Sequence, residues 1–234
     1  MSDFDAHVDS YRDSVQSSIA FAGQEVEYFS QRKSDQLIDV AARLVGDPRR
    51  LSFLDVGSGV GLTDTCLTDR VGTLVGVDES HHALVSAAGR NPEVRHCTAD
   101  GRNLPFGTAT FDVAFAVCVV HHIPVDRRPA FVAEMARVVR PGGLVVVFEH
   151  NALNPLTRVA VSRCEFDVDV KLLTRRATGR LLSAAGLEPI EARDIIFTTF
   201  DRPWARRLDR LLGWVPFGAQ HYVAARRVSR GPER

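Results

Sequence analysis

The arrangement of apolar and polar residues predicts a chain of alternating helices and strands. Between Gln24 and Val45 apolar residues recur at steps of three and four, which predicts an amphipathic helix that ends at Gly46-Asp47-Pro48. From Leu51 onward, short apolar runs alternate with helical patterns. Such alternation is expected of a mostly parallel sheet with helices on both faces, so the predicted fold class is α/β.

Apolar runs bounded by turn residues locate the strands. They are expected at about 51–56, 74–77, 94–97, 110–120, 144–148, 190–200 and 220–225. Further helices are expected to follow the first and second strands, to run through Phe131 and Val139, to lie between Thr174 and Gly186, and to begin at Pro203.

A glycine-rich turn follows the first strand and is the strongest functional signal. Three glycines spaced two apart, Gly57, Gly59 and Gly61, come directly after Asp55 and Val56. Glycine can adopt positive φ and lets a ligand lie against the main chain. The spacing differs from the G-x-G-x-x-G pattern of dinucleotide enzymes. A carboxylate at Asp55 would also repel a pyrophosphate, but it suits a ligand that carries an ammonium and a sulfonium.

This turn resembles the first motif of the class I S-adenosylmethionine-dependent methyltransferases. Asp100, the following Leu104-Pro105-Phe106 and Thr110-Phe111-Asp112, and the later Arg140-Pro141-Gly142-Gly143 are similar to further motifs of that family. The resemblance covers about residues 51–150. It implies a seven-stranded, mostly parallel Rossmann-like sheet whose last strand is antiparallel at the edge. It also implies S-adenosylmethionine as the cofactor and S-adenosylhomocysteine as the product.

The cofactor-binding residues follow from these motifs. Asp78 comes about 20 residues after Asp55, the spacing at which a carboxylate reaches the two hydroxyls of a ribose. The resemblance implies that Asp100 accepts a hydrogen bond from the adenine amino group. The complete predicted set is Asp55, Gly57, Ser58, Gly59, Gly61, Asp78, Glu79, Asp100, Gly101, Val117 and Cys118.

Histidines at the ends of the fourth and fifth strands are the candidate bases, because histidine titrates near working pH. His121 and His122 are adjacent residues that leave a strand, where neighbours point in opposite directions, so at most one of them is expected to face the substrate. His150 follows the fifth strand. We predict His150 as the catalytic base, His121 as the alternative, and Asn151 as the residue that orients His150.

The chain is expected to form a single domain with three parts: an N-terminal helical lid (1–47), a cofactor-binding core (51–150) and a substrate-side segment (151–234). Tyr11, Tyr28 and Arg32 are candidate lid residues, with plain packing as the alternative. The helix from Pro203 has an apolar stripe and an arginine stripe. We interpret the arginines as a solvated face, with phosphate or carboxylate binding as the alternative. The stripes are Trp204, Leu208, Leu211 and Leu212, and Arg202, Arg206 and Arg210.

Composition narrows the possible partners. The net charge is zero and the pI is about 7.1, so neither nucleic acid nor an anionic membrane is expected as a partner. Four cysteines without C-x-x-C spacing predict free thiols and no metal site. The chain lacks a signal-like start and an apolar run of roughly 20 residues, so it is expected in the cytoplasm. A monomer or homodimer acting on a small molecule is expected.

The predicted reaction is methyl transfer to a hydroxyl of a small-molecule metabolite. Glu149-His150-Asn151 followed by Asn154-Pro155-Leu156-Thr157 is similar to a bacterial subgroup associated with surface-sugar and secondary-metabolite pathways, so a sugar or secondary-metabolite intermediate is the expected acceptor. An amine acceptor is the runner-up. The alternatives of other classes are a regulatory protein that binds S-adenosylmethionine without turnover and a dehydrogenase, whose glycine spacing this chain lacks.

Overall fold

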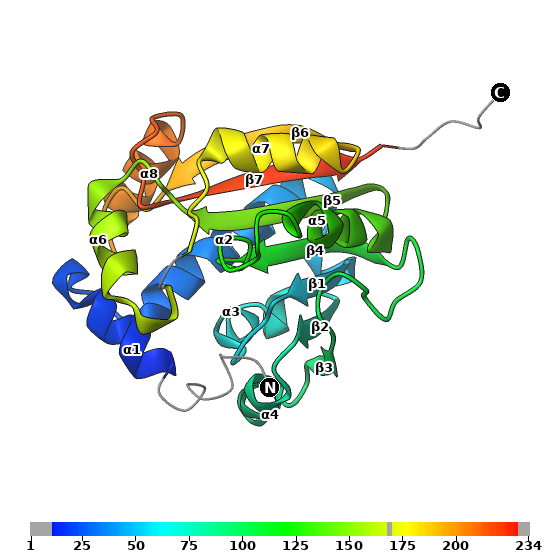
Figure 1. Ribbon diagram of the computed structural model, residues 1–234. Coiled ribbons are helices and arrows are strands. Elements are labelled where there is room, and N and C mark those ends of the chain that lie inside the picture. The colour runs from blue at the N-terminus through cyan, green and yellow to red at the C-terminus, as the bar shows by residue number, and fades with distance from the viewer. Residues whose placement is uncertain (1–10, 168–169, 229–234) are drawn as a thin grey trace.

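The computed structural model describes residues 11–167 and 170–228. Its described residues form one seven-stranded sheet in the order β3-β2-β1-β4-β5-β7-β6, with helices on both faces (Figure 1). The predicted fold class is confirmed. The strands are β1 Ser52–Val56, β2 Thr73–Asp78, β3 Arg95–Thr98, β4 Phe111–Val117, β5 Val139–His150, β6 Leu187–Ile195 and β7 Gln220–Arg227.

The helices lie between the strands and before them. Short 3₁₀ turns at Ala20–Ala22, Pro48–Arg50, Thr68–Arg70 and Glu165–Asp167 complete the described elements. The predicted caps at Ser80 and Thr174 form, because each hydroxyl accepts a hydrogen bond from a backbone N–H of the following first turn. The helices are α1 Tyr11–Ser18, α2 Val26–Leu44, α3 Leu62–Thr65, α4 His81–Arg90, α5 Arg128–Val138, α6 Pro155–Arg163, α7 Arg175–Ala184 and α8 Pro203–Leu212.

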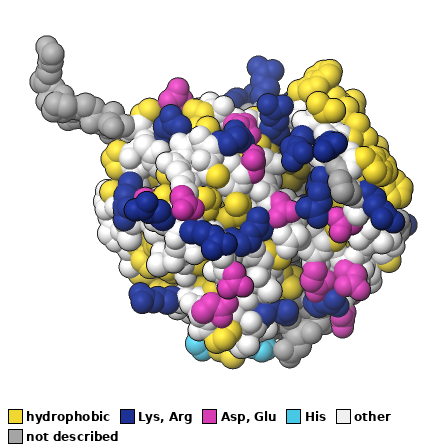
Figure 2. Space-filling model, turned by 180° about the vertical axis from the view of Figure 1, so that it is seen from behind, with side chains coloured by type: hydrophobic (Ala, Val, Ile, Leu, Met, Phe, Trp, Pro, Cys, Tyr) yellow, Lys and Arg dark blue, Asp and Glu magenta, His cyan; other side chains and the backbone are white. Residues whose placement is uncertain are grey.

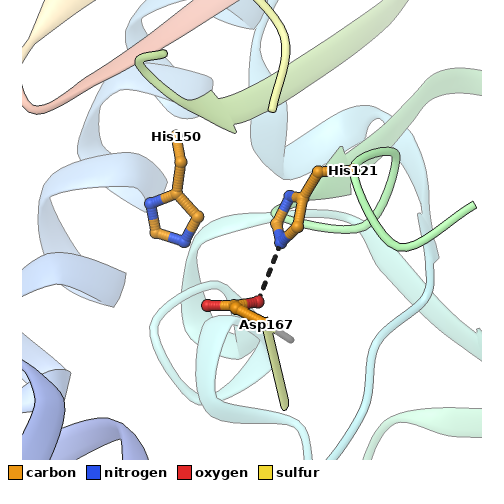
Figure 3. A group of neighbouring side chains, drawn as sticks. All are labelled: His121, His150 and Asp167. Atoms are coloured by element: carbon orange, nitrogen blue, oxygen red, sulfur yellow. Dashed lines mark hydrogen bonds and ion pairs between the residues drawn. The ribbon is translucent and has the colours of Figure 1, made fainter. Parts of the chain in front are cut away.

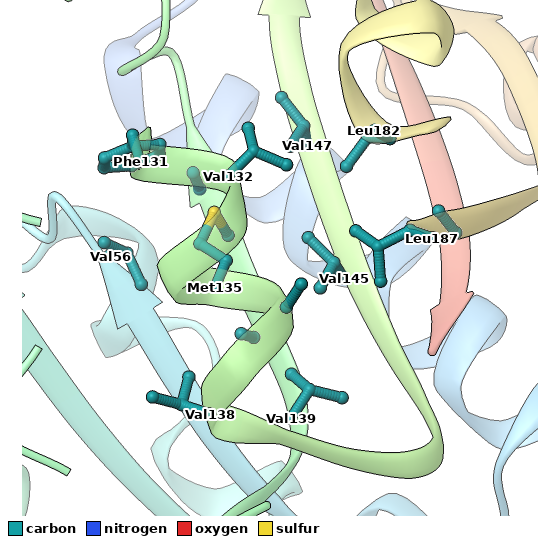
Figure 4. Packing of buried hydrophobic residues seen from close by; sticks show 14 of the residues in the cluster. Val56, Phe131, Val132, Met135, Val138, Val139, Val145, Val147, Leu182 and Leu187 are labelled. Atoms are coloured by element: carbon teal, nitrogen blue, oxygen red, sulfur yellow. The ribbon is translucent and has the colours of Figure 1, made fainter. Parts of the chain in front are cut away.

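Two hydrophobic layers sandwich the sheet. Met135 of α5 and Leu182 of α7 pack with Val145 and Val147 on one face (Figure 4). Leu37 of α2 packs with Phe53, Phe115, Val146 and other strand residues on the opposite face. Because successive strand residues point to opposite faces, β1, β4 and β5 supply both layers and are covered on both sides.

The last strand lies inside the sheet. Strand β7 is antiparallel, as predicted, but it pairs with both β5 and β6, and β6 is the edge strand. The expectation that β7 forms the edge is therefore wrong. Its side chains from Gln220 to Ala225 are all buried, which fits a strand with neighbours on both sides.

Other elements also differ from the sequence prediction, and β5 begins at Val139 instead of Leu144. Strand β4 ends at Val117 because Cys118 has a left-handed backbone (φ 57°), so the chain turns before the histidines. Strand β6 ends at Ile195 and does not extend to Phe200. Helix α6 was not predicted, although Asn154 caps it through the N–H of Thr157 and Pro155 occupies its first turn.

No helix in the described part of the chain is long and apolar enough to span a membrane.

Candidate functional site

A cavity of about 1420 Å³ lies at the carboxyl ends of the central strands, where ligands bind in open α/β sheets. The glycine turn, the end of β2 and the end of β4 line one part of it. Residues of α1, α2 and α6 and the segment after β6 line the other part. Its volume exceeds the roughly 300–1,000 Å³ typical of one small-molecule site, so it can hold a cofactor and an acceptor together.

The glycine turn has the conformation that the sequence predicts. Gly57, Gly59 and Gly61 all have positive φ, between 53° and 87°. A Cβ on Gly57 would lie 2.5 Å from the side chain of Val119, whereas a Cβ on Gly59 would meet nothing within 4 Å. The backbone at Gly59 is therefore open to the cavity. Gly61 instead faces Asn91 and caps α3, and it is not among the residues that line the cavity.

Two predicted carboxylates are fixed at the cavity wall by backbone donors. Asp78 accepts hydrogen bonds of 2.9 Å from the N–H groups of Gly59 and Ser80. Asp100 accepts from the N–H of Arg102 at 3.0 Å, and these bonds lower the pKa of its carboxyl group. Both side chains are therefore oriented before a ligand arrives. Glu79, Gly101, Ser58, Val117 and Cys118 also line the cavity, as expected.

Asp55 is buried at the end of β1. Burial and the neighbouring Asp64 raise the pKa of Asp55 well above its usual value. Its Oδ1 has no hydrogen-bond partner, and the same is true of the Oγ atom of Ser58. Such orphaned buried polar atoms require a partner, which a bound ligand can provide. Lys33 of α2 is also buried and lines the cavity, and its charge acts against the rise in the pKa of Asp55.

A buried charge network surrounds His121. Its Nδ1 lies 2.5 Å from Oε2 of Glu149, and its Nε2 lies 3.2 Å from Oδ1 of Asp167. Burial alone would lower the pKa of His121, but the charge of Glu149 and the hydrogen bonds to both carboxylates raise it to about 10. Burial likewise opposes ionisation of Glu149, yet His121 lowers the pKa of that carboxyl group to about 2. His121 is thus an imidazolium at neutral pH.

His150 projects from the end of β5 toward the same point of the cavity (Figure 3). Its ring centroid lies 5.2 Å from that of His121. Burial and the positive charge of His121 lower the pKa of His150 to about 4, so it is neutral at working pH. Its Nδ1 lies 3.4 Å from Nε2 of Gln220, a residue that the sequence prediction missed.

Two expectations about neighbouring residues are wrong. Asn151 does not orient His150, because its side-chain amide donates to Asp194 and to the carbonyl of Gly218. His121 and His122 both line the cavity, and their ring centroids are 4.1 Å apart. They lie in a turn beyond β4, so the alternation of an extended strand does not apply to them.

The lid candidates have structural contacts. Arg32 forms an ion pair of 2.5 Å with Asp209 of α8, and the hydroxyl of Tyr28 donates to the carbonyl of Thr198. The side chain of Tyr11 lies outside the described residues. Among the charged residues of the described N-terminal helices, Lys33 lines the cavity, and the sequence contains a signal for it. It lies four residues after Phe29 and four before Leu37, so it interrupts an apolar helix face.

A metal ion could also be held here. One ligand atom each from His121, His150 and Asp167 lies within 4.8 Å of the others, whereas no metal was expected from the cysteine pattern. A metal at this point would have to displace the proton from His121, because a histidine ligand must donate a lone pair. The ion pairs of His121 therefore compete with metal binding.

The cofactor-binding part of the cavity fits S-adenosylmethionine. Its acidic groups, Asp55 and Asp78, suit a cationic ligand with ribose hydroxyls, and Lys33 suits a carboxylate. The open backbone at Gly59 gives a ligand close access to the main chain.

Comparison with known proteins agrees with this geometry. Residues 54–147 match a family model described as a methyltransferase domain. The chain is 34% identical over 146 residues to phosphatidylethanolamine N-methyltransferase of Cereibacter sphaeroides. This aligned segment covers 59% of this chain and 70% of the relative.

A second relative is much longer than the segment that it shares with this chain. The chain is 32% identical over 125 residues to tRNA (carboxymethyluridine(34)-5-O)-methyltransferase of Arabidopsis thaliana, covering 51% of this chain but only 29% of the relative. The fold is similar to the crystal structure of an S-adenosylmethionine-dependent methyltransferase from Thermotoga maritima. The TM-score is 0.69 at 17% identity, covering 96% of this chain and 97% of the other. The chain belongs to the class I S-adenosylmethionine-dependent methyltransferases.

Proposed function

We propose that this protein methylates a hydroxyl group of a small-molecule metabolite, with His150 as the base. The observation that carries the proposal is the position of His150: a neutral histidine shares one cavity with the glycine turn and its carboxylates. S-adenosylmethionine supplies the electrophilic methyl group. The protein contributes a cavity that places an acceptor oxygen against it, and this positioning accounts for much of the rate.

His150 accepts the proton that the acceptor hydroxyl loses. When the new C–O bond forms, the oxygen becomes strongly acidic, so a base with a pKa near 4 is sufficient to take the proton. His121 keeps this base in its neutral form, because a second positive charge 5.2 Å away is unfavourable. Glu149 in turn keeps His121 charged and fixed.

The remaining wall of the cavity supports an acceptor with an apolar body. Val15 of α1, Ile19 directly after α1, Phe29 of α2, and Leu156 and Val161 of α6 line the cavity. Burial of such a body contributes affinity at roughly 25 cal/mol per Å² of apolar surface. The polar reacting group then lies beside the histidines. Sugar and secondary-metabolite intermediates with an apolar portion fit this arrangement.

An amine acceptor is the second candidate, because Asp167 and Glu165 also line the cavity and suit an ammonium group. The relative from Cereibacter sphaeroides is named an N-methyltransferase. An amine that binds neutral needs no dedicated base, so His150 would be dispensable for it.

The test uses matched acceptors that differ only in a hydroxyl or an amine, scored by S-adenosylhomocysteine release. We expect turnover of the hydroxyl compound, and His150→Asn should reduce it at least about 100-fold with unchanged cofactor affinity. His81→Asn, on the exposed start of α4, is the control. Turnover of the amine alone, unaffected by His150→Asn, would establish the second candidate. Cofactor binding without turnover of any acceptor would indicate a regulatory protein.

A further inference from the structure

Exposed hydrophobic side chains are concentrated on one corner of the molecule. Of the twelve large hydrophobic residues exposed in the described part of the chain, nine lie on α6, on α8 or on the segments that flank these two helices. We call this the α6–α8 surface. It consists of Leu153, Leu156, Val159, Phe200, Trp204, Leu208, Leu211, Trp214 and Phe217.

The α6–α8 surface is held in place by the rest of the fold. Asp209, on the inner face of α8, pairs with Arg32 of α2 and accepts from the N–H of Phe197. The side chain of Asn154 donates to the carbonyl of Phe217, which ties the segment after α8 to α6. Ala205 and Asp209 are buried on the inner face. The apolar stripe of α8 therefore faces outward, because the side of the helix that carries Ala205 and Asp209 packs against the rest of the protein.

The hydrophobic side chains of this surface are largely exposed. Leu211 is 72% exposed and Trp214 is 69% exposed. The sequence pattern predicted an apolar stripe on this helix, and an apolar stripe normally packs on a core. In this protein Trp204, Leu208 and Leu211 of that stripe are exposed, so no core in the described part of the chain covers them. Large exposed patches of this kind mark surfaces that bind a protein or a membrane.

Arginines border the apolar residues. Arg202, just before α8, and Arg207 and Arg210 on α8 are exposed, and none of them has a carboxylate within ion-pair distance in the described residues. Arg206 differs, because it pairs with Asp201 and Asp35. Figure 2, which views the molecule from behind, shows Lys and Arg side chains next to a hydrophobic area at the upper right; this side corresponds to the left of Figure 1, where α6 and α8 lie.

We propose that the α6–α8 surface docks onto the interface of an anionic phospholipid bilayer. A helix with Trp and Leu on one face and arginines beside them lies in the plane of such an interface, where the aromatic rings enter the headgroup region and the arginines meet lipid phosphates. A second copy of this chain is a poorer occupant, because a two-fold contact places the same arginines against each other.

The cavity lies next to the proposed docking surface. Leu156 belongs to the surface and also lines the cavity, and Phe197, just before α8, lines it too. The mouth of the cavity thus opens beside the docking surface. If the proposed function holds, the acceptor is an amphiphile with an apolar chain, which passes from the bilayer along Leu156 with its hydroxyl group toward His150.

Docking is tested by co-sedimentation of the full chain with vesicles of phosphatidylcholine alone and of phosphatidylcholine with phosphatidylglycerol. We expect binding to the anionic vesicles and its loss in Leu211→Gln/Trp214→Gln. Arg207→Gln/Arg210→Gln should weaken binding about 25-fold, since each arginine near an anionic surface contributes about fivefold. The control is Val85→Gln/Arg50→Gln, which changes exposed residues outside the surface.

None of these four surface residues lines the cavity, so S-adenosylmethionine affinity and circular dichroism should be unchanged in every variant. Wild-type protein that stays in the supernatant with anionic vesicles overturns the proposal, as does binding that both surface variants retain. Concentration-dependent dimerisation that Leu211→Gln/Trp214→Gln abolishes, without vesicle binding, assigns the surface to a second copy and also overturns it.

The acceptor is tested separately, by S-adenosylhomocysteine release from a hydroxylated amphiphile in vesicles and from its water-soluble headgroup analogue. We expect faster turnover of the amphiphile, and slower turnover of it in Leu211→Gln/Trp214→Gln. Equal turnover of both compounds overturns the membrane route to the cavity while the proposed function stands. Absence of turnover with either acceptor, together with intact vesicle binding, contradicts the proposed function alone.

Discussion

The Nδ1 atom of His121 lies 2.5 Å from Oε2 of Glu149, and both side chains are almost fully buried. The Oε1 atom of Glu149 accepts from the N–H of Val120, at 2.7 Å. One carboxylate therefore fixes both the charge of His121 and the turn that carries it. The site depends on this pair, because burial and the charge of His121 together lower the pKa of His150.

Glu149→Gln should lower the free energy of unfolding by about 3–5 kcal/mol, the cost of breaking a buried pair. The raised pKa of His121 contributes stability that is complete below pH 6.5 and lost as pH rises toward 10. The lowered pKa of Glu149 contributes stability that is complete above pH 4.5 and lost as pH falls toward 2.

The difference between wild type and Glu149→Gln should therefore be largest between pH 4.5 and 6.5, measured by urea denaturation. Asp39→Asn, which breaks the exposed pair with Arg43, is the control and should cost about 0.5 kcal/mol or less. A difference that does not vary with pH would show that the pair is not ionic.

The acidic limb of kcat/KM should report His150. Because its pKa is lowered to about 4, turnover should stay constant down to about pH 5 and fall only below that. His121→Gln removes the nearby positive charge, so it should move this limb toward the ordinary value for histidine, 6.5. A limb that already lies near 6.5 in the wild type, and does not move in His121→Gln, rules out this arrangement.

Binding of S-adenosylmethionine should release protons from Asp55. Burial and Asp64 raise the pKa of Asp55, and a cationic ligand beside it favours the carboxylate form. Calorimetric titrations in buffers with different ionisation enthalpies should show a release that increases toward acidic pH and approaches about one proton per cofactor. Asp55→Asn should remove this release and weaken binding. Identical heats in all buffers would contradict the prediction.

Turnover should not require a metal ion. The three ligand atoms of His121, His150 and Asp167 lie close together, but His121 holds a proton between two carboxylates. We expect EDTA to leave kcat unchanged and added Zn²⁺ to inhibit by taking His150 out of its role as base. Loss of activity in EDTA that Mg²⁺ or Zn²⁺ restores would instead make the histidines metal ligands.

The sequence predicted the parts of the site that local chemistry determines. The turn from Asp55 to Gly59 and the caps at Ser80 and Thr174 depend on neighbouring residues, and they were found. The contacts of His150 depend on strand order. Gln220 reaches it from a strand 70 residues later, and no local pattern contains that pairing.

Other errors arose where a local rule was applied to the wrong element. His121 and His122 were treated as strand residues, but Cys118 turns the chain first. The stripe with Trp204 and Leu211 was recognised, yet an apolar stripe alone does not say whether a core covers it. The zero net charge does not describe the arginines on and beside α8, because a sum over the chain carries no information about position; the helical spacing after Arg202 located them.

The interior position of β7 affects the order in which the protein can be assembled during translation. Strands β5 and β6 both need β7 as their neighbour, and β7 ends at Arg227. A nascent chain therefore cannot complete its sheet until residues through Arg227 have left the ribosome exit tunnel. Until then β5 has an unpaired edge, so binding of a chaperone to ribosome-bound chains should persist until that last strand emerges.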